Sequence, residues 1–117
     1  MRIIQEDILA KALVSNELKI SEPKEGKIFY PDKGEETRLI SVKGVLSKKE
    51  VGKGRKILVV IRTDRNYPQA LGLAKEKWEF PECRLGGVDH QIFAVLLDFE
   101  DNPIFRSKSV RVRLIRK

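Results

Sequence analysis

Two short apolar runs constrain the fold of this chain more than any other feature. The first extends from Ile57 to Ile61 and the second from Ile92 to Leu97. Both are rich in β-branched or aromatic residues and are bounded by polar turn residues, which is typical of buried central strands. The rest of the chain is therefore expected to supply the cover that these two strands need.

Size and composition predict one globular domain. The chain has 117 residues, enough for a single core between two packed layers. Hydrophobic residues make up 41% and charged residues 35%, so the chain is too apolar to be disordered. A single His, Met and Cys beside many Lys, Arg and Glu indicate a heat-adapted source. The net charge of +7 permits an acidic or polyanionic partner without requiring one.

Alternating apolar residues predict further strands on either side of the central runs. These are Leu18–Ser21, Ile28–Tyr30, Thr37–Leu46, a strand holding Trp78 and Phe80, and Val110–Leu114. Gly44 lies inside one of them and suggests a bulge or a close backbone approach. Residues 68–77 are expected to form a loop or a short edge strand despite their local helix propensity. Trp78 is expected to fill the core, and the alternative is an aromatic platform for a ligand. About seven strands with frequent turns predict an antiparallel sandwich.

A short amphipathic helix is predicted before the strands, from Gln5 to Val14. Ile8, Leu9 and Leu13 lie with Ala12 on its apolar face. So short a helix must pack on something: its own domain, a partner or a second copy. The predicted boundaries are residues 1–16 for this helical extension and 17–117 for the β domain. Early acidic residues and the lack of any membrane-spanning run predict a cytoplasmic protein without membrane contact.

Several segments resemble, in order and spacing, the bacterial immunoglobulin-like domains. They are Leu18–Gly26, Ile40–Gly44, Ile57–Ile61, Tyr67-Pro68-Gln69, Trp78, Leu85-Gly86-Gly87, Phe93–Leu96 and Phe99–Leu114. The Tyr-Pro-Gln triplet after the third strand is similar to one subgroup of that family. The resemblance covers Leu18 to Lys117, with departures at residues 70–77 and at Asn102-Pro103. It implies an immunoglobulin-like β-sandwich that acts as a spacer or interaction module and catalyses no reaction.

No motif predicts a catalytic, cofactor or metal site. The Gly52–Lys56 loop lacks the Gly-Lys-Ser/Thr ending of a phosphate-binding loop. His90 beside Asp89 has no nucleophile placed by a motif, and a solvated turn histidine is expected. Residues 98–103 resemble calcium-binding linkers, but a solvated turn is the preferred interpretation. Cys83, without a second cysteine, is expected to be a small core residue.

The C-terminal charges are the most informative about function. After Asp101 the chain has no acidic residue, whereas six cations follow: Arg106, Lys108, Arg111, Arg113, Arg116 and Lys117. Arg111 and Arg113 are expected to project from one face of the last strand. In an immunoglobulin-like sandwich the basic loop 48–56 would lie beside the acidic turn 98–102, which lowers the case for an anion site there. The cationic strand either binds a polyanion or is an edge that resists aggregation.

These features favour a non-catalytic module that binds a protein or links parts of an assembly. The alternative is a binder of nucleic acid or another polyanion, but Trp78, Phe93 and Phe99 fall at core-like positions and leave few stacking platforms. A carbohydrate or surface-adhesion module would need a secreted setting. The N-terminal helix is the second predicted contact surface. We expect the protein to self-associate through this helix. The residues expected to bind partners are Arg106, Lys108, Arg111, Arg113, Arg116, Ile8, Leu9 and Leu13.

Overall fold

β-Strands dominate the secondary structure of the computed structural model, which describes residue 9 and residues 11–116. Within these residues it forms nine strands and one 3-10 helix, η1 (Lys48–Glu50). The strands are β1 (Leu18–Glu22), β2 (Lys27–Phe29), β3 (Arg38–Leu46), β4 (Lys56–Arg62), β5 (Asn66–Leu73), β6 (Lys77–Leu85), β7 (Asp89–Leu97), β8 (Pro103–Arg106) and β9 (Val110–Leu114). No helix in the described residues is long and apolar enough to cross a membrane. The prediction of an all-β fold is confirmed.

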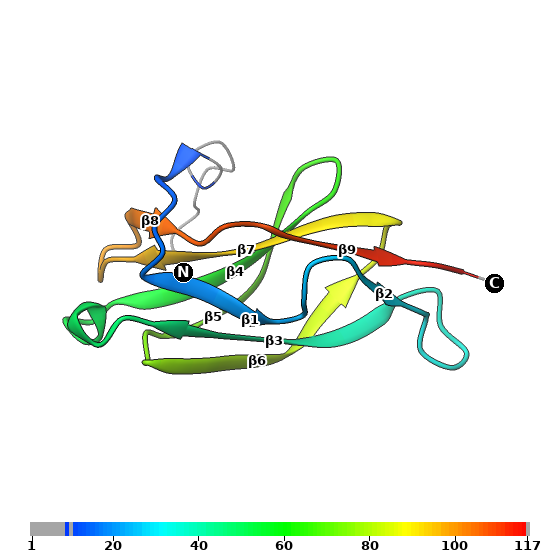
Figure 1. The fold of residues 1–117 in the computed structure, drawn as a ribbon, viewed down its shortest axis with the longest axis horizontal. Helices are drawn as coiled ribbons and strands as arrows, with labels where there is room; N and C mark the ends of the chain where they lie inside the picture. The colour runs from blue at the N-terminus through cyan, green and yellow to red at the C-terminus, as the bar shows by residue number, and fades with distance from the viewer. Residues whose placement is uncertain (1–8, 10, 117) are drawn as a thin grey trace.

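The strands form two sheets that lie one over the other (Figure 1). The smaller sheet has the order β1-β3-β6. The larger has the order β2-β9-β7-β4-β5, and β8 pairs with β7 beside β9. Neighbouring strands are antiparallel except β2, which pairs in parallel with β9. The chain therefore starts with β1 in the smaller sheet and crosses to the edge of the larger sheet at β2.

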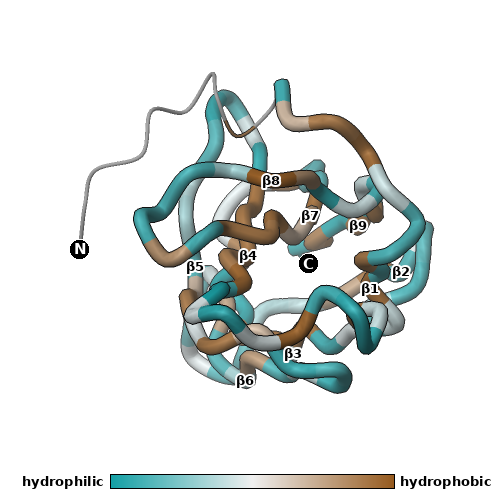
Figure 2. Tube along the Cα trace, turned by 90° about the vertical axis from the view of Figure 1, so that its left-hand side faces the viewer, coloured by the Kyte–Doolittle hydropathy of each residue, from teal (hydrophilic) through white to brown (hydrophobic). Residues whose placement is uncertain are grey.

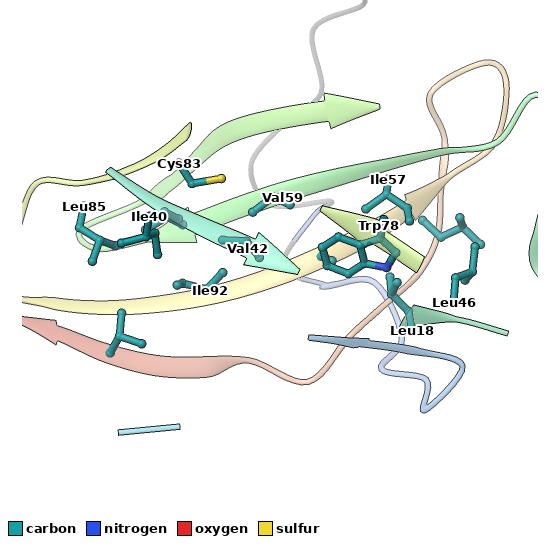
Figure 3. Close-up of a cluster of buried hydrophobic side chains, with 14 of the residues drawn as sticks. Leu18, Ile40, Val42, Leu46, Ile57, Val59, Trp78, Cys83, Leu85 and Ile92 are labelled. Carbon is teal, nitrogen blue, oxygen red and sulfur yellow. The ribbon is translucent and has the colours of Figure 1, made fainter. Parts of the chain in front are cut away.

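The two sheets share one apolar core (Figure 3). The larger sheet contributes alternate residues of its central strands, such as Ile57 and Val59 from β4 and Ile92 from β7. Trp78 of β6 is 4% exposed and lies in this core, as predicted. The side-chain alternation of a strand explains why the next residues along β4 and β7 point to the opposite face.

Gly44 permits a close approach of the Trp78 ring and of the β1 backbone. A Cβ atom built on Gly44 would lie 2.1 Å from Trp78 Cζ2 and 2.2 Å from the carbonyl oxygen of Lys19. The predicted close backbone approach at this glycine is confirmed. The indole of Trp78 occupies the space that any other side chain at position 44 would need.

A second apolar cluster lies on the outer face of the larger sheet, the face turned away from the smaller sheet. It consists of Leu58, Val60, Phe93, Val95, Leu97 and Leu9. Leu9 has no exposed surface, so the N-terminal segment covers this part of β4 and β7. Figure 2 shows β4 and β7 coloured as hydrophobic along much of their length. Burial on both faces explains the uninterrupted apolar runs of β4 and β7.

The N-terminal helix expected over Gln5 to Val14 is not confirmed. Residues 5–8 and 10, including Ile8, lie outside the described residues. Leu13 to Ser15 pair with β8 instead: the Arg106 amide donates to the Leu13 carbonyl at 2.8 Å, and the Ser15 amide donates to the Arg106 carbonyl at 2.8 Å. Leu13 itself is 80% exposed. Leu9 and Lys11 have helical backbone, and the two hydrogen bonds to β8 explain why residues 13–15 do not continue as a helix.

Residues 66–73 form a full edge strand, β5, longer than the expected loop or short edge strand. Gly72 permits this because the Phe80 ring of β6 lies against it, and a Cβ at position 72 would come within 2.8 Å of that ring. The Gln69 side chain accepts a hydrogen bond from the Arg84 amide at 2.9 Å and so links the two sheets. Tertiary contacts therefore override the helix propensity of this segment.

Candidate protein-binding face

Arg111 and Arg113 project from the outer face of β9, as predicted, but each meets an acidic residue. Arg111 Nε lies 3.0 Å from Glu25 Oε2, and the Arg111 amide donates to Glu25 Oε1 at 2.8 Å. Arg113 Nε lies 3.0 Å from Asp89 Oδ1. The backbone hydrogen bond from Arg111 is the main reason that the pKa of Glu25 is lowered. The β9 arginines and their partners Glu25 and Asp89 thus form a surface that carries both positive and negative charge.

The other predicted cations have separate surroundings. The guanidinium of Arg116 donates to the carbonyl oxygens of Glu36, Gly86 and Gly87 at 2.7–3.2 Å. It therefore holds two turns together. Lys108 is exposed in the segment between β8 and β9. The predicted cationic strand is not one continuous surface, since its charges lie on different parts of the fold.

Arg106 points from β8 onto the outer face of the larger sheet. Its guanidinium carbon lies 4.7 Å from the centre of the Phe93 ring, a cation–π distance. Its Nε atom is buried and has no hydrogen-bond partner among the described residues. Burial is the first cause that lowers the pKa of Arg106, and the charge of Arg62 is the second. Arg62 of β4 therefore adds positive charge to the surroundings of Arg106.

The part of the outer face that Leu9 leaves uncovered is the candidate binding surface. We call it the open face, and it consists of Ile28, Arg62, Asp89, Gln91, Arg111 and Arg113. The strand register places Gln91 of β7 directly between Arg62 of β4 and Arg111 of β9. The neighbouring row pairs Asp89 with Arg113, beside which Ile28 of β2 is 48% exposed. These residues line an open depression of about 480 Å³.

Sequence reasoning missed three members of this face: Ile28, Arg62 and Gln91. The apolar run of β4 ends at Ile61, and Arg62 is the first polar residue after it. Gln91 likewise immediately precedes the apolar run of β7. The sequence thus shows where the buried part of each strand ends. It does not show the strand order, which is what places the two ends side by side.

The apolar residues predicted to bind a partner differ in their exposure. Leu9 is fully buried in its own domain, which agrees with one of the three alternatives for the N-terminal segment. Leu13 is exposed, and Ile8 lies outside the described residues. Phe99, expected at a core-like position, is 67% exposed in the turn after β7. That prediction is wrong because β7 ends two residues earlier, at Leu97.

His90 is not the solvated turn residue that the sequence suggests. It lies within β7, is 2% exposed, and its Nε2 accepts a hydrogen bond from the Gly87 amide at 3.0 Å. Burial lowers its pKa, so the neutral ring is favoured. The ring supports the turn before β7, a structural role.

Cys83 has a structural role in the core. Burial raises the pKa of the Cys83 thiol to about 11, and the side chain is part of the core, as predicted.

In the turn after β7, Asp98 Oδ1 accepts hydrogen bonds from the amides of Glu100 and Asn102 at 2.9 Å each. Lys56 pairs with Asp101, so the acidic turn does neutralise part of the basic loop.

In comparisons with known proteins, no protein-family model matches the chain, and no curated protein matches it.

Proposed function

We propose that this chain is a non-catalytic, immunoglobulin-like module that binds another protein through the open face. The strand order supports the immunoglobulin-like part of the proposal. In such domains strands A, B and E lie in one sheet, while G, F and C lie in the other, which a further strand extends beyond C. Here β1-β3-β6 and β9-β7-β4-β5 follow the same orders.

The protein-binding proposal rests on the two ion pairs that the arginines of β9 form with neighbouring acidic residues. Arg111 with Glu25 and Arg113 with Asp89 present both signs on one surface, together with the amide of Gln91 and the apolar side chain of Ile28. Arginine, amide and apolar groups in one patch are typical of protein interfaces. Exposed ion pairs contribute little to stability, so they can exchange partners at low cost.

Nucleic-acid binding remains the second candidate because Arg62, Arg106 and Lys108 have no acidic partner among the described residues. The acidic groups of Glu25 and Asp89 weigh against it, since they would repel a phosphate backbone that approached β9. Exposed aromatic rings for stacking are also missing from the described part of the open face.

A salt titration separates the two candidates. We expect the protein to bind duplex DNA weakly, and the variant Arg111→Ser with Arg113→Ser to bind it equally weakly. A phosphate-binding surface would instead give a slope of about −0.9 per contact in log K against log salt, and the double change would flatten that slope by about two units. Steep, submicromolar binding that the double variant loses would refute the proposal.

Capture of a partner from lysate of the source organism tests the positive claim. The captured protein should survive nuclease treatment, and the Arg111→Ser, Arg113→Ser variant should retain less of it. The matched control is Lys33→Gln with Lys75→Gln, which removes the same charge from exposed positions outside the open face. Equal loss in both variants would indicate a general charge effect.

A further inference from the structure

The strand β5 differs from the other strands at the ends of the two sheets because it carries no charged residue. Within the described residues it is the last strand of the larger sheet, beyond β4 on the side away from β7 (Figure 2). Its sequence is NYPQALGL. The other end strands each contain a lysine: Lys19 in β1, Lys27 in β2 and Lys77 in β6. Charged residues on an edge strand discourage pairing with another chain, so β5 lacks a common protection.

Pro68 protects only the first half of β5. Proline has no amide hydrogen to donate to a further strand. The register with β4 then shifts between Val59 and Val60, which marks a bulge on β5. The regular part of β5 that follows this bulge extends from Ala70 to Leu73. This second half is the part of the edge that suits a further strand.

The backbone and side chains of Leu71 and Leu73 point in useful directions. The Ala74 amide donates to the carbonyl of Arg55, the residue before β4, at 3.0 Å. Backbone groups of an antiparallel strand alternate in direction, so those of Leu71 and Leu73 point away from β4. Both side chains lie on the outer face, where Leu71 packs against the second apolar cluster and Leu73 is 67% exposed. This edge therefore presents hydrogen-bonding groups and an apolar side chain together.

Two copies of β5 are complementary in antiparallel register. When Gly72 lies opposite the second copy's Gly72, Leu71 of each copy lies opposite the other copy's Leu73. Each of these pairs can exchange backbone hydrogen bonds in both directions, and each Leu73 gains an apolar neighbour on the outer face. A two-fold axis relates the two copies, as in most protein dimers. Chains of net charge +7 repel each other, and an uncharged strand brings them together without adding like charges to the contact.

We propose that two copies of this chain associate through β5, so that their larger sheets join into one continuous sheet. The inference is independent of the proposed function, because the open face meets β4 at Arg62, the end of that strand remote from Leu73. A contact centred on residues 70–73 is smaller than a standard protein interface. We therefore expect a weak dimer, with a dissociation constant of about 100 μM.

Sedimentation equilibrium of the full chain, from about 10 μM to 1 mM, tests the proposal. We expect the wild type to approach the dimer mass at the upper end of this range. Leu73→Lys should remain a monomer, because it places a charge on the pairing edge of each copy. The position is exposed, so circular dichroism should show an unchanged fold. The matched control Leu39→Lys makes the same replacement at a 40% exposed leucine of β3 and should dimerise like the wild type.

Amide shifts and salt dependence identify the surface at which the copies meet. Raising the concentration of the wild type should shift the amides of Leu71 and Leu73 more than that of Gly72, whose backbone groups point toward β4. Raising NaCl from about 50 to 500 mM should strengthen the dimer, because salt screens the repulsion between two positive chains. Association through the ion pairs of the open face would instead weaken with salt.

Three results would overturn the inference. The first is a wild type that stays monomeric at about 1 mM. The second is a Leu73→Lys variant that dimerises as tightly as Leu39→Lys. The third is a dimer whose concentration-dependent shifts lie at Gln91 and Arg111 and not in β5, since the two copies would then meet at the open face.

Discussion

Replacing Gly44 by alanine should be among the most destabilising single changes in this domain. The added methyl group would lie 2.1 Å from the Trp78 ring and 2.2 Å from the Lys19 carbonyl. Comfortable separations between such atoms are about 3.5–4.0 Å, so each neighbour would have to move by about 1.5 Å. Neither neighbour is a flexible chain end: one is a buried ring, and the other is backbone of β1, which pairs with Gly44 through Ile20.

The cost follows from this geometry. Overpacking of a core usually costs about 1–3 kcal/mol, and two rigid neighbours place Gly44→Ala at or above the upper end of that range. Total stabilities of about 5–15 kcal/mol make such a loss easy to measure. The assay is urea unfolding followed by circular dichroism and by the fluorescence of Trp78, the single tryptophan of the chain.

Gly86→Ala is the matched control, because a Cβ at position 86 has no atom within 4 Å. We expect this variant to stay within about 0.5 kcal/mol of the wild type. Adding Trp78→Leu to Gly44→Ala should rescue little, since the clash with the Lys19 carbonyl persists. If Gly44→Ala unfolds within about 0.5 kcal/mol of Gly86→Ala, then β1, β3 and the indole are not packed as described.

Three further predictions concern other buried groups. Leu9→Ala should cost about 2–5 kcal/mol in urea unfolding because Leu9 is fully buried, whereas Leu13→Ala, at an 80% exposed position, should change stability by less than about 0.5 kcal/mol. The lowered pKa of His90 means that the unfolded chain binds a proton that the folded chain resists. Stability should therefore fall as the pH drops below about 6.5, the usual pKa of a histidine, and His90→Asn should reduce the part of this loss that lies above pH 5. Cys83, with its pKa raised to about 11, should react with a maleimide at pH 7 only in denaturant, and rapid labelling of the folded protein would contradict its burial.

The parts of the fold that were predictable are those with a local cause. The apolar runs of β4 and β7 need burial wherever they lie, and the alternation in β3 and β9 indicates which side faces inward. Gly44 and Trp78 were identified for the same reason, because a glycine inside a strand and a large ring each need a special environment.

The errors have non-local causes. The helix propensity of residues 70–77 lost to a pairing with β4 and to the Phe80 ring that lies against Gly72. His90 follows the turn signal of Gly86-Gly87, yet β7 begins before it, and its ring closes that turn from inside. The partner of Arg111 is Glu25, 86 residues away in the chain, and no sequence pattern connects the two.

The candidate site illustrates the same limit and explains why its arginines are unequal. Cations are easy to count in a sequence, but their effect depends on which carboxylates the strand order brings to them. The β2–β9 pairing sets Glu25 beside Arg111, and the β7–β9 pairing sets Asp89 beside Arg113. Arg62 has a different position in the register, opposite Gln91 of β7 and Asn66 of β5. The strand order therefore brings two amides to Arg62, whereas it brings a carboxylate to Arg111 and to Arg113.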